Sequence, residues 1–101
     1  MADYYVDSTV GGPGAGTIGD PWDDINSNLS TLGPGDTLYL RGGANPAARQ
    51  DYNETLAITS GNGCSNGTSG NEITISNYSN EYVRLYSAAT TVLIDMELDY
   101  W

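Results

Sequence analysis

The stretch GDPWDDINSNLSTLGPGDTLYLRGG, residues 19–43, decides how the chain folds, because it joins a short amphipathic segment to an apolar strand. Asp20 is a residue type that caps helices, and Pro21 suits the first helical position, where its missing N–H is not needed. Four apolar residues then recur at helical spacing: Trp22, Ile25, Leu29 and Leu32. The pattern predicts an amphipathic α-helix over about residues 21–32, with an apolar face that must cover another part of the protein.

Short strands are predicted after this helix. Gly33 and Pro34 end the helix, and Gly35-Asp36 forms a turn into a strand over residues 37–41. Alternating or apolar runs predict the other strands, at residues 4–6, 54–59, 72–76, 82–86 and 91–100. The residues Leu38, Leu56, Ile73 and Val92 recur at intervals of 18, 17 and 19. Such an interval favours a mainly β solenoid, in which strands stack and the loops between them project.

Length and charge limit the classes of partner. The 101 residues suffice for one small domain, which we place at residues 1–101. The chain has 13 acidic residues, three arginines and neither lysine nor histidine, so its formal net charge is −10. Because nucleic acids and anionic membranes are bound through Lys and Arg, neither is an expected partner. No stretch of the sequence is long and apolar enough to span a bilayer.

The N-terminus and the single cysteine bear on the compartment. The first five residues, MADYY, contain neither a charged nor an apolar leader region, which predicts a protein made in a cytoplasm. Cys64 is alone, so neither an intrachain disulfide nor a cysteine-based zinc site is expected. Its Gly/Asn-rich surroundings predict an exposed loop that carries an ordinary thiol.

Several of these segments together resemble a known family. The order YYVD (4–7), a Gly-rich loop, DPW (20–22), an amphipathic segment and PGDTLYLRGG (34–43) is similar to the N-terminal entry of right-handed parallel β-helix proteins of the pectate-lyase-like group. The segments at 54–60 and 70–76 resemble the next strands of that fold, so the resemblance covers roughly residues 3–86. It implies a short parallel β-helix whose first coil is capped by the helix. The same opening precedes lyases, hydrolases and phage tail or surface proteins, so it implies no single activity.

The resemblance suggests a polysaccharide lyase as one activity. Proton abstraction beside a uronate carboxylate needs a tuned base and neutralisation of the acid. Arg41 follows the PGDT strand, but pairing with Asp36 or a neighbouring carboxylate explains it more simply. The resemblance also implies calcium, for which five aspartates could cluster: Asp7, Asp20, Asp23, Asp24 and Asp36. Caps and a solvated face explain these aspartates better, so no cofactor is expected, and calcium is the alternative.

Glycoside hydrolysis by paired carboxylates is a second activity. In the predicted strand 91–100, Asp95, Glu97 and Asp99 fall on one face. Neighbouring carboxylates at this spacing lie roughly 7 Å apart, within the range that an inverting glycosidase uses. An amphipathic strand with a charged solvent face explains the same pattern, and charges at a sheet edge discourage aggregation. We therefore expect no catalytic residues.

Binding is the third kind of function. The chain has eight tyrosines and two tryptophans, residue types that favour protein interfaces and stacking on sugars. The possible carbohydrate contacts are Tyr39, Tyr52, Tyr78, Tyr82 and Tyr86. The terminal strand, about residues 91–101, carries an apolar face that we expect to be an interface with another subunit: Val92, Ile94, Met96, Leu98, Tyr100 and Trp101.

These observations favour a non-enzymatic structural or assembly module. A chain that stops after two or three coils leaves an open end, which we expect another protein subunit to cover, either a second copy or a larger scaffold. A virion component, such as a phage capsid decoration (cement) protein or a tail-associated protein, fits this description. The alternative is the N-terminal segment of an extracellular polysaccharide lyase or hydrolase, or of a carbohydrate-binding β-helix protein, with glycans as possible partners.

Overall fold

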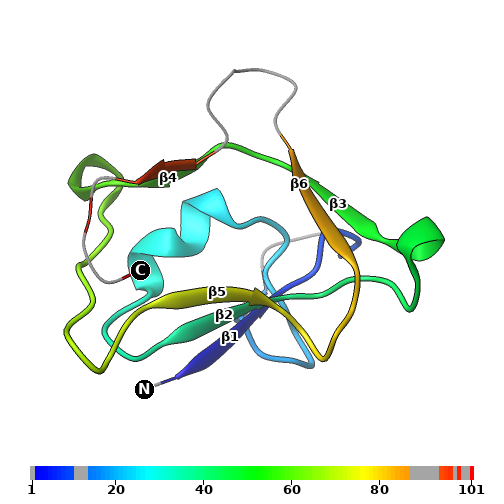
Figure 1. Ribbon diagram of the computed structural model, residues 1–101, viewed down its shortest axis with the longest axis horizontal. Helices are drawn as coiled ribbons and strands as arrows, with labels where there is room; N and C mark the ends of the chain where they lie inside the picture. Colours follow the sequence, from blue (N-terminus) through cyan, green and yellow to red (C-terminus); the bar gives the residue numbers. More distant parts are fainter. Residues whose placement is uncertain (1, 11–13, 87–93, 97, 99–100) are drawn as a thin grey trace.

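The computed structural model describes residues 2–10, 14–86, 94–96, 98 and 101 (Figure 1). In this part of the chain the protein is mainly β and its strands pair in parallel. The strands are β1 (Asp3–Val6), β2 (Thr37–Leu40), β3 (Gln50–Asn53), β4 (Leu56–Ile58), β5 (Thr74–Asn77), β6 (Val83–Tyr86) and β7 (Ile94–Met96). The helical pieces are 3₁₀ turns, η1 (Asn26–Thr31), η2 (Pro46–Ala48) and η3 (Ser60–Asn62).

The described strands form one three-stranded sheet and two two-stranded sheets. The first has the order β1-β2-β5, and the others pair β3 with β6 and β4 with β7. In the first sheet Leu38 lies beside Tyr4 on one side and beside Ile75 on the other. The later strands β5, β6 and β7 therefore pair, in the same order, with β2, β3 and β4, and this part of the chain follows the path of the earlier part.

Most of the predicted strands are confirmed with different bounds: β1 begins one residue earlier than predicted, β5 is shifted to Thr74–Asn77, and β2, β4 and β6 are shorter. The strand predicted over 54–59 is only β4, and β3 was missed because its sequence, QDYN, is polar apart from Tyr52. Of the strand predicted over 91–100, β7 is described and pairs with β4. The structure of residues 91–93, 97, 99 and 100 lies outside the described part of the chain.

The prediction of an α-helix over residues 21–32 is wrong. Only Asn26–Thr31 is helical, and it is a 3₁₀ helix. Trp22 is instead bridged in parallel to Val6, and its backbone N–H donates to the Tyr5 carbonyl oxygen at 2.9 Å. Asp20 does not cap the helix, because its carboxylate accepts from the backbone N–H of Ala15. The Trp22 carbonyl oxygen also accepts from the backbone N–H of Asp7 at 2.9 Å, so pairing with β1 takes an acceptor that an α-helix starting at residue 21 would use.

The N-terminal amides of η1 are satisfied from a distant part of the sequence. The Glu54 carboxylate, between β3 and β4, accepts from the backbone N–H of Ile25 at 2.9 Å and of Asn26 at 2.8 Å. The Asn26 side-chain oxygen in turn accepts from the backbone N–H of Ala57 in β4. These bonds fix η1 against β4, and Figure 1 shows the helix (cyan) between β4 and the β1-β2-β5 sheet.

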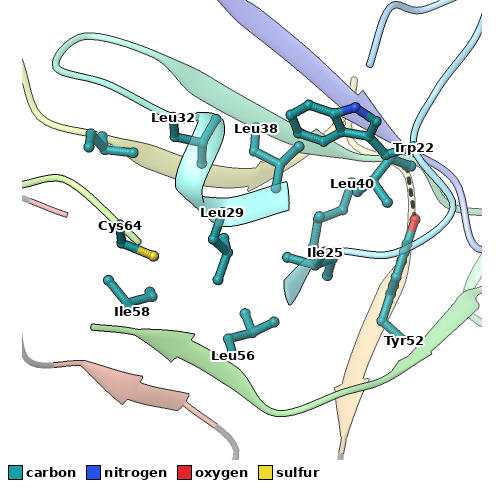
Figure 2. Packing of buried hydrophobic residues seen from close by; sticks show 12 residues of the cluster. Trp22, Ile25, Leu29, Leu32, Leu38, Leu40, Tyr52, Leu56, Ile58 and Cys64 are labelled. Atoms are coloured by element: carbon teal, nitrogen blue, oxygen red, sulfur yellow. Dashed lines mark hydrogen bonds between the residues drawn. The ribbon is translucent and has the colours of Figure 1, made fainter. Parts of the chain in front are cut away.

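The apolar face predicted for residues 21–32 is confirmed even though the helix type is not. Trp22, Ile25, Leu29 and Leu32 are all buried, in one cluster with the inward residues of β2, β3 and β4 (Figure 2). Burial of each such side chain stabilises the fold by about 1.5–3 kcal/mol. The expectation of an exposed Cys64 is wrong, because its thiol is buried in the same cluster and contacts the Ala57 carbonyl oxygen.

The two glycines of the RGG segment are required by close backbone contacts. A Cβ atom on Gly42 would clash with the backbone of Tyr82, and one on Gly43 would clash with the backbone of Ala48. Gly43 also bridges Tyr82 through two backbone hydrogen bonds, of 3.1 and 2.9 Å. The segment after β2 therefore carries two glycines so that η2 and the start of β6 can pack against it.

Candidate functional site

Three tyrosines cluster at the outer face of the β1-β2-β5 sheet. Tyr5 and Tyr39 are register partners, and both point away from the core because their neighbours in sequence, Val6, Leu38 and Leu40, are buried. Their rings stack with centroids 5.5 Å apart. The ring of Tyr78, just after β5, contacts both edge-on, at 5.5 and 5.7 Å. We call Tyr5, Tyr39 and Tyr78 the tyrosine face.

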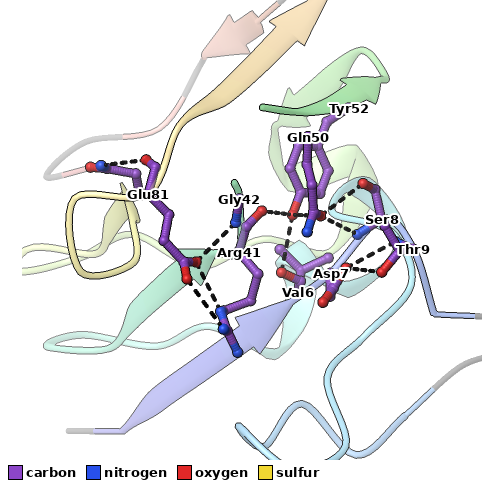
Figure 3. Close-up of polar contacts among 10 residues, drawn as sticks. Val6, Asp7, Ser8, Thr9, Arg41, Gly42, Gln50, Tyr52 and Glu81 are labelled. Carbon is purple, nitrogen blue, oxygen red and sulfur yellow. Dashed lines mark hydrogen bonds and ion pairs between the residues drawn. The ribbon is translucent and has the colours of Figure 1, made fainter. Parts of the chain in front are cut away.

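Arg41 extends this cluster beyond the end of β2. Its guanidinium lies 4.9 Å from the centroid of the Tyr78 ring. It also forms a two-pronged ion pair with Glu81, with Nε–Oε1 3.0 Å and Nη2–Oε2 3.2 Å (Figure 3). The prediction that Arg41 pairs with a nearby carboxylate is confirmed, and the partner is Glu81. Asp36 is instead a buried residue that accepts from the backbone N–H groups of Ala2 and Gly33.

A tight turn places Tyr78 and Glu81 together. Ser79 and Asn80 both have positive φ, 49° and 61°, and the backbone N–H of Glu81 donates to the Tyr78 carbonyl oxygen at 2.8 Å. These are the angles of a type I′ turn, which reverses the chain in four residues. The turn brings the Glu81 carboxylate back to Arg41, where it also accepts from the backbone N–H of Gly42.

The charges at the face stabilise one another. The hydrogen bond from Arg41 lowers the pKa of Glu81, and the bond to Glu81 raises the pKa of Arg41. The pKa of Tyr5 is raised, first by partial desolvation and then by the negative charge of Asp3. The hydroxyl groups of the three tyrosines can each donate and accept hydrogen bonds.

Tyr52 is a core residue, so the expectation that it contacts carbohydrate is wrong. Its ring is buried, and its hydroxyl donates to the Arg41 carbonyl oxygen at 2.7 Å and lies 3.1 Å from that of Val6 (Figure 3). Burial raises its pKa. Nearby, the Gln50 side chain accepts from Ser8. These contacts hold the ends of β1 and β2 against β3, directly behind Arg41.

The other two tyrosines predicted to contact sugar, Tyr82 and Tyr86, make no ring contact with the described tyrosine face. Tyr82 is 46% exposed, and Tyr86 in β6 is covered by Arg84, whose guanidinium lies 4.5 Å from the ring centroid. Among the five tyrosines predicted to contact sugar, the structure thus brings together Tyr39 and Tyr78. Tyr5 was missed, since only the parallel register of β1 with β2 places it beside Tyr39.

Four of the five aspartates considered for calcium accept hydrogen bonds from nearby groups of the protein. Asp7 accepts from the backbone and hydroxyl of Thr9, and Asp24 accepts from Ser27 and Asn28. Within the described part of the chain, no three Asp, Glu, Cys or His residues lie close enough to hold a metal ion. For the glycosidase hypothesis, Glu97 and Asp99 and the side chain of Asp95 lie outside the described residues.

A hollow lies where β5 turns into β6. It has a volume of about 470 Å³, and its lining includes the inward apolar residues Leu40, Ile75, Val83 and Leu85. Tyr82 also lines it. Among the described strands only β2 has two neighbours, so β5, β6 and β7, like β1, β3 and β4, each have one edge with no described strand paired to it.

The residues predicted as a subunit interface are only partly described. Leu98 and Trp101 pack against the core of their own chain, and the indole N–H of Trp101 donates to the Ser65 carbonyl oxygen at 2.8 Å. Val92 and Tyr100, and the side chains of Ile94 and Met96, lie outside the described part of the chain. None of the helices that the structure describes is long and apolar enough to cross a membrane.

Comparison with known proteins gives no relative from which a role can be transferred: no protein-family model matches the sequence, and no curated protein matches it. The site must therefore be interpreted from its own geometry.

Proposed function

We propose that the protein is a short parallel β-helix module that binds saccharide, without catalysis, on its tyrosine face. The observation that carries the proposal is the ring cluster of Tyr5, Tyr39 and Tyr78 on an outer sheet surface. Tyrosine suits such a surface because its ring packs against the apolar faces of a sugar and its hydroxyl bonds the sugar's hydroxyl groups.

The β-helix part of the proposal is supported by the order of pairing. β2, β3 and β4 are followed by strands that pair with them in the same order and in parallel. This is the arrangement expected when successive coils stack. The sequence resemblance to the start of pectate-lyase-like proteins agrees with it.

Binding rather than chemistry is supported by the state of the charged groups. The Arg41 guanidinium is held by both oxygens of Glu81 and by the Tyr78 ring, so it is not poised to abstract or donate a proton. The long-range contacts behind it, through Tyr52, give the face a rigid support, which keeps the entropy cost of binding low.

Titration calorimetry of the whole chain with uncharged and acidic hexasaccharides tests the proposal. Tyr39→Ala removes the central ring, and we expect it to weaken binding at least tenfold, since aromatic contacts at binding sites are often worth more than 1 kcal/mol. Tyr86→Ala is the matched control, because that ring lies on another sheet and should leave binding unchanged. Equal loss in both variants, or no binding of any saccharide by the wild type, would refute the proposal.

Assembly is a second candidate, favoured by the free edges of β5, β6 and β7 and by the apolar hollow beside them. A further layer of parallel strands, from a second copy or a scaffold, would pair with these edges and fill the hollow. A virion component is the setting we propose for such an assembly. Native mass spectrometry tests it: Tyr82→Lys should shift an oligomer toward monomer, whereas Ile18→Lys, equally exposed but outside the hollow, should not. A wild type that is monomeric at high concentration argues against self-assembly.

A further inference from the structure

The tyrosine face continues into a groove along the same sheet. The groove has a volume of about 330 Å³ and is lined by Asp3, Gly35, Thr37, Gly70, Asn71, Glu72 and Thr74. Asp3, Thr37 and Thr74 are register partners on β1, β2 and β5. They precede the row of Tyr5 and Tyr39 by two residues, or roughly 6.6 Å along the strands. Because side chains two residues apart point to the same face, groove and rings form one continuous surface.

The described lining of the groove is acidic and includes no basic side chain. Its lining includes two carboxylates, Asp3 and Glu72, together with two threonine hydroxyls, and neither lysine nor arginine. All three arginines of the chain are already ion-paired. Arg41 is held by Glu81, and Arg49 and Arg84 both contact Asp51, at 3.3 and 2.9 Å. A carboxylate or sulfate brought to this surface would meet negative charge, and no unpaired arginine would offset it.

We infer that the ligand of this surface is an uncharged oligosaccharide, with one part stacked on the tyrosine face and a neighbouring sugar unit in the groove. The inference rests on the proposed function and names the class of saccharide. Acidic polysaccharides such as polygalacturonate are excluded from this surface by the charges of Asp3 and Glu72.

The chemistry of the groove agrees with an uncharged ligand. An ionised carboxylate is only an acceptor of hydrogen bonds, and a pair of adjacent sugar hydroxyls can donate to its two oxygens. The Thr37 and Thr74 hydroxyls can both donate and accept, so they match the remaining hydroxyl groups. A uronate offers its own carboxylate as a further acceptor, which these carboxylates cannot satisfy.

The test compares two sets of probes on the whole chain at pH 7. The uncharged set is cello-, malto- and mannohexaose, and the acidic set is hexagalacturonate and hexaguluronate, each titrated at low and at physiological salt. We expect at least one uncharged probe to bind and both acidic probes to fail. The double variant Asp3→Asn/Glu72→Gln should weaken the uncharged probe about tenfold, because hydrogen bonds to charged groups are among the stronger ones. Asp23→Asn, which lies outside the groove, is the control and should bind like wild type.

The outcomes separate this inference from the proposed function. Binding of an acidic probe that Tyr39→Ala abolishes would overturn the uncharged class while leaving a saccharide-binding tyrosine face. Binding of an uncharged probe that the double variant leaves unchanged would overturn the role of the groove. Failure of every probe to bind would refute both the inference and the proposed function.

Discussion

Replacing Leu29 by Ala tests whether η1 packs on the core as described. Leu29 is fully buried, and the structure surrounds it with Ile25, Leu32, Leu56 and other apolar residues (Figure 2). Removing a fully buried leucine side chain costs about 2.7–5 kcal/mol, with the lower values where the surroundings can collapse. Since η1 is a six-residue piece that can shift into the space, we expect a loss of about 3 kcal/mol.

Urea denaturation of the whole chain measures this loss. With an m-value of about 1.5 kcal/mol/M, a loss of about 3 kcal/mol lowers the unfolding midpoint by about 2 M. Thr31→Ala is the matched control, because it lies in the same helix and is exposed, and it should change stability by less than about 0.5 kcal/mol. A midpoint for the leucine variant that equals that of the control would show that η1 does not cover the core, and the packing described here would be incorrect.

Three further results are expected. The lowered pKa of Glu81 means that its pairing with Arg41 stabilises the fold above the ordinary glutamate value of 4.5, and this stabilisation is lost as pH falls through the folded pKa. The difference in unfolding free energy between wild type and Glu81→Gln should therefore be full at pH 6 and should shrink as pH falls below 4.5. The pKa of Glu54 is raised, mainly by burial, so its effect on stability changes with pH in the opposite direction. Relative to Glu54→Gln, wild type should lose stability as pH rises through and above 4.5. A stability difference that does not vary with pH would contradict this. Gly43→Ala should cost about 1–3 kcal/mol in thermal or urea unfolding because its Cβ meets backbone at the end of η2, whereas Gly19→Ala, with open space around it, should be neutral.

The buried face of the N-terminal segment was predictable from sequence, and its backbone conformation was not. Spacing alone identified Trp22, Ile25, Leu29 and Leu32 as one apolar face, and all four are buried. The backbone conformation involves contacts with β1 and with Glu54, 29 residues beyond Ile25, which takes the place of a local cap. A cap supplied from that distance leaves no signal in the local sequence.

The tyrosine face was half predictable for a similar reason. Tyr39 and Tyr78 stood out by residue type, but Tyr5 joins them only through the register of β1 with β2. The recurrence of apolar residues at 17–19 residues indicated repetition, yet the register pairs Leu38 with Ile75 and Leu56 with Ile94, about twice that interval. The interval of 17–19 residues therefore separates strands of different sheets, such as β2 and β4, and is not the interval between strands that pair.

The parallel pairing has a consequence for how the chain reaches this structure. Every strand pair in the described part joins segments more than 30 residues apart, since β1 pairs with β2, and β2, β3 and β4 pair with β5, β6 and β7. No local hairpin among these strands is available to act as a folding nucleus. The chain must therefore lose the entropy of closing a long loop before the first pair of parallel strands can form its hydrogen bonds. Chains with such contacts fold in milliseconds to seconds rather than microseconds. During synthesis, the backbone amides and the apolar face of η1 therefore cannot form their contacts until residues 54–57 have been made.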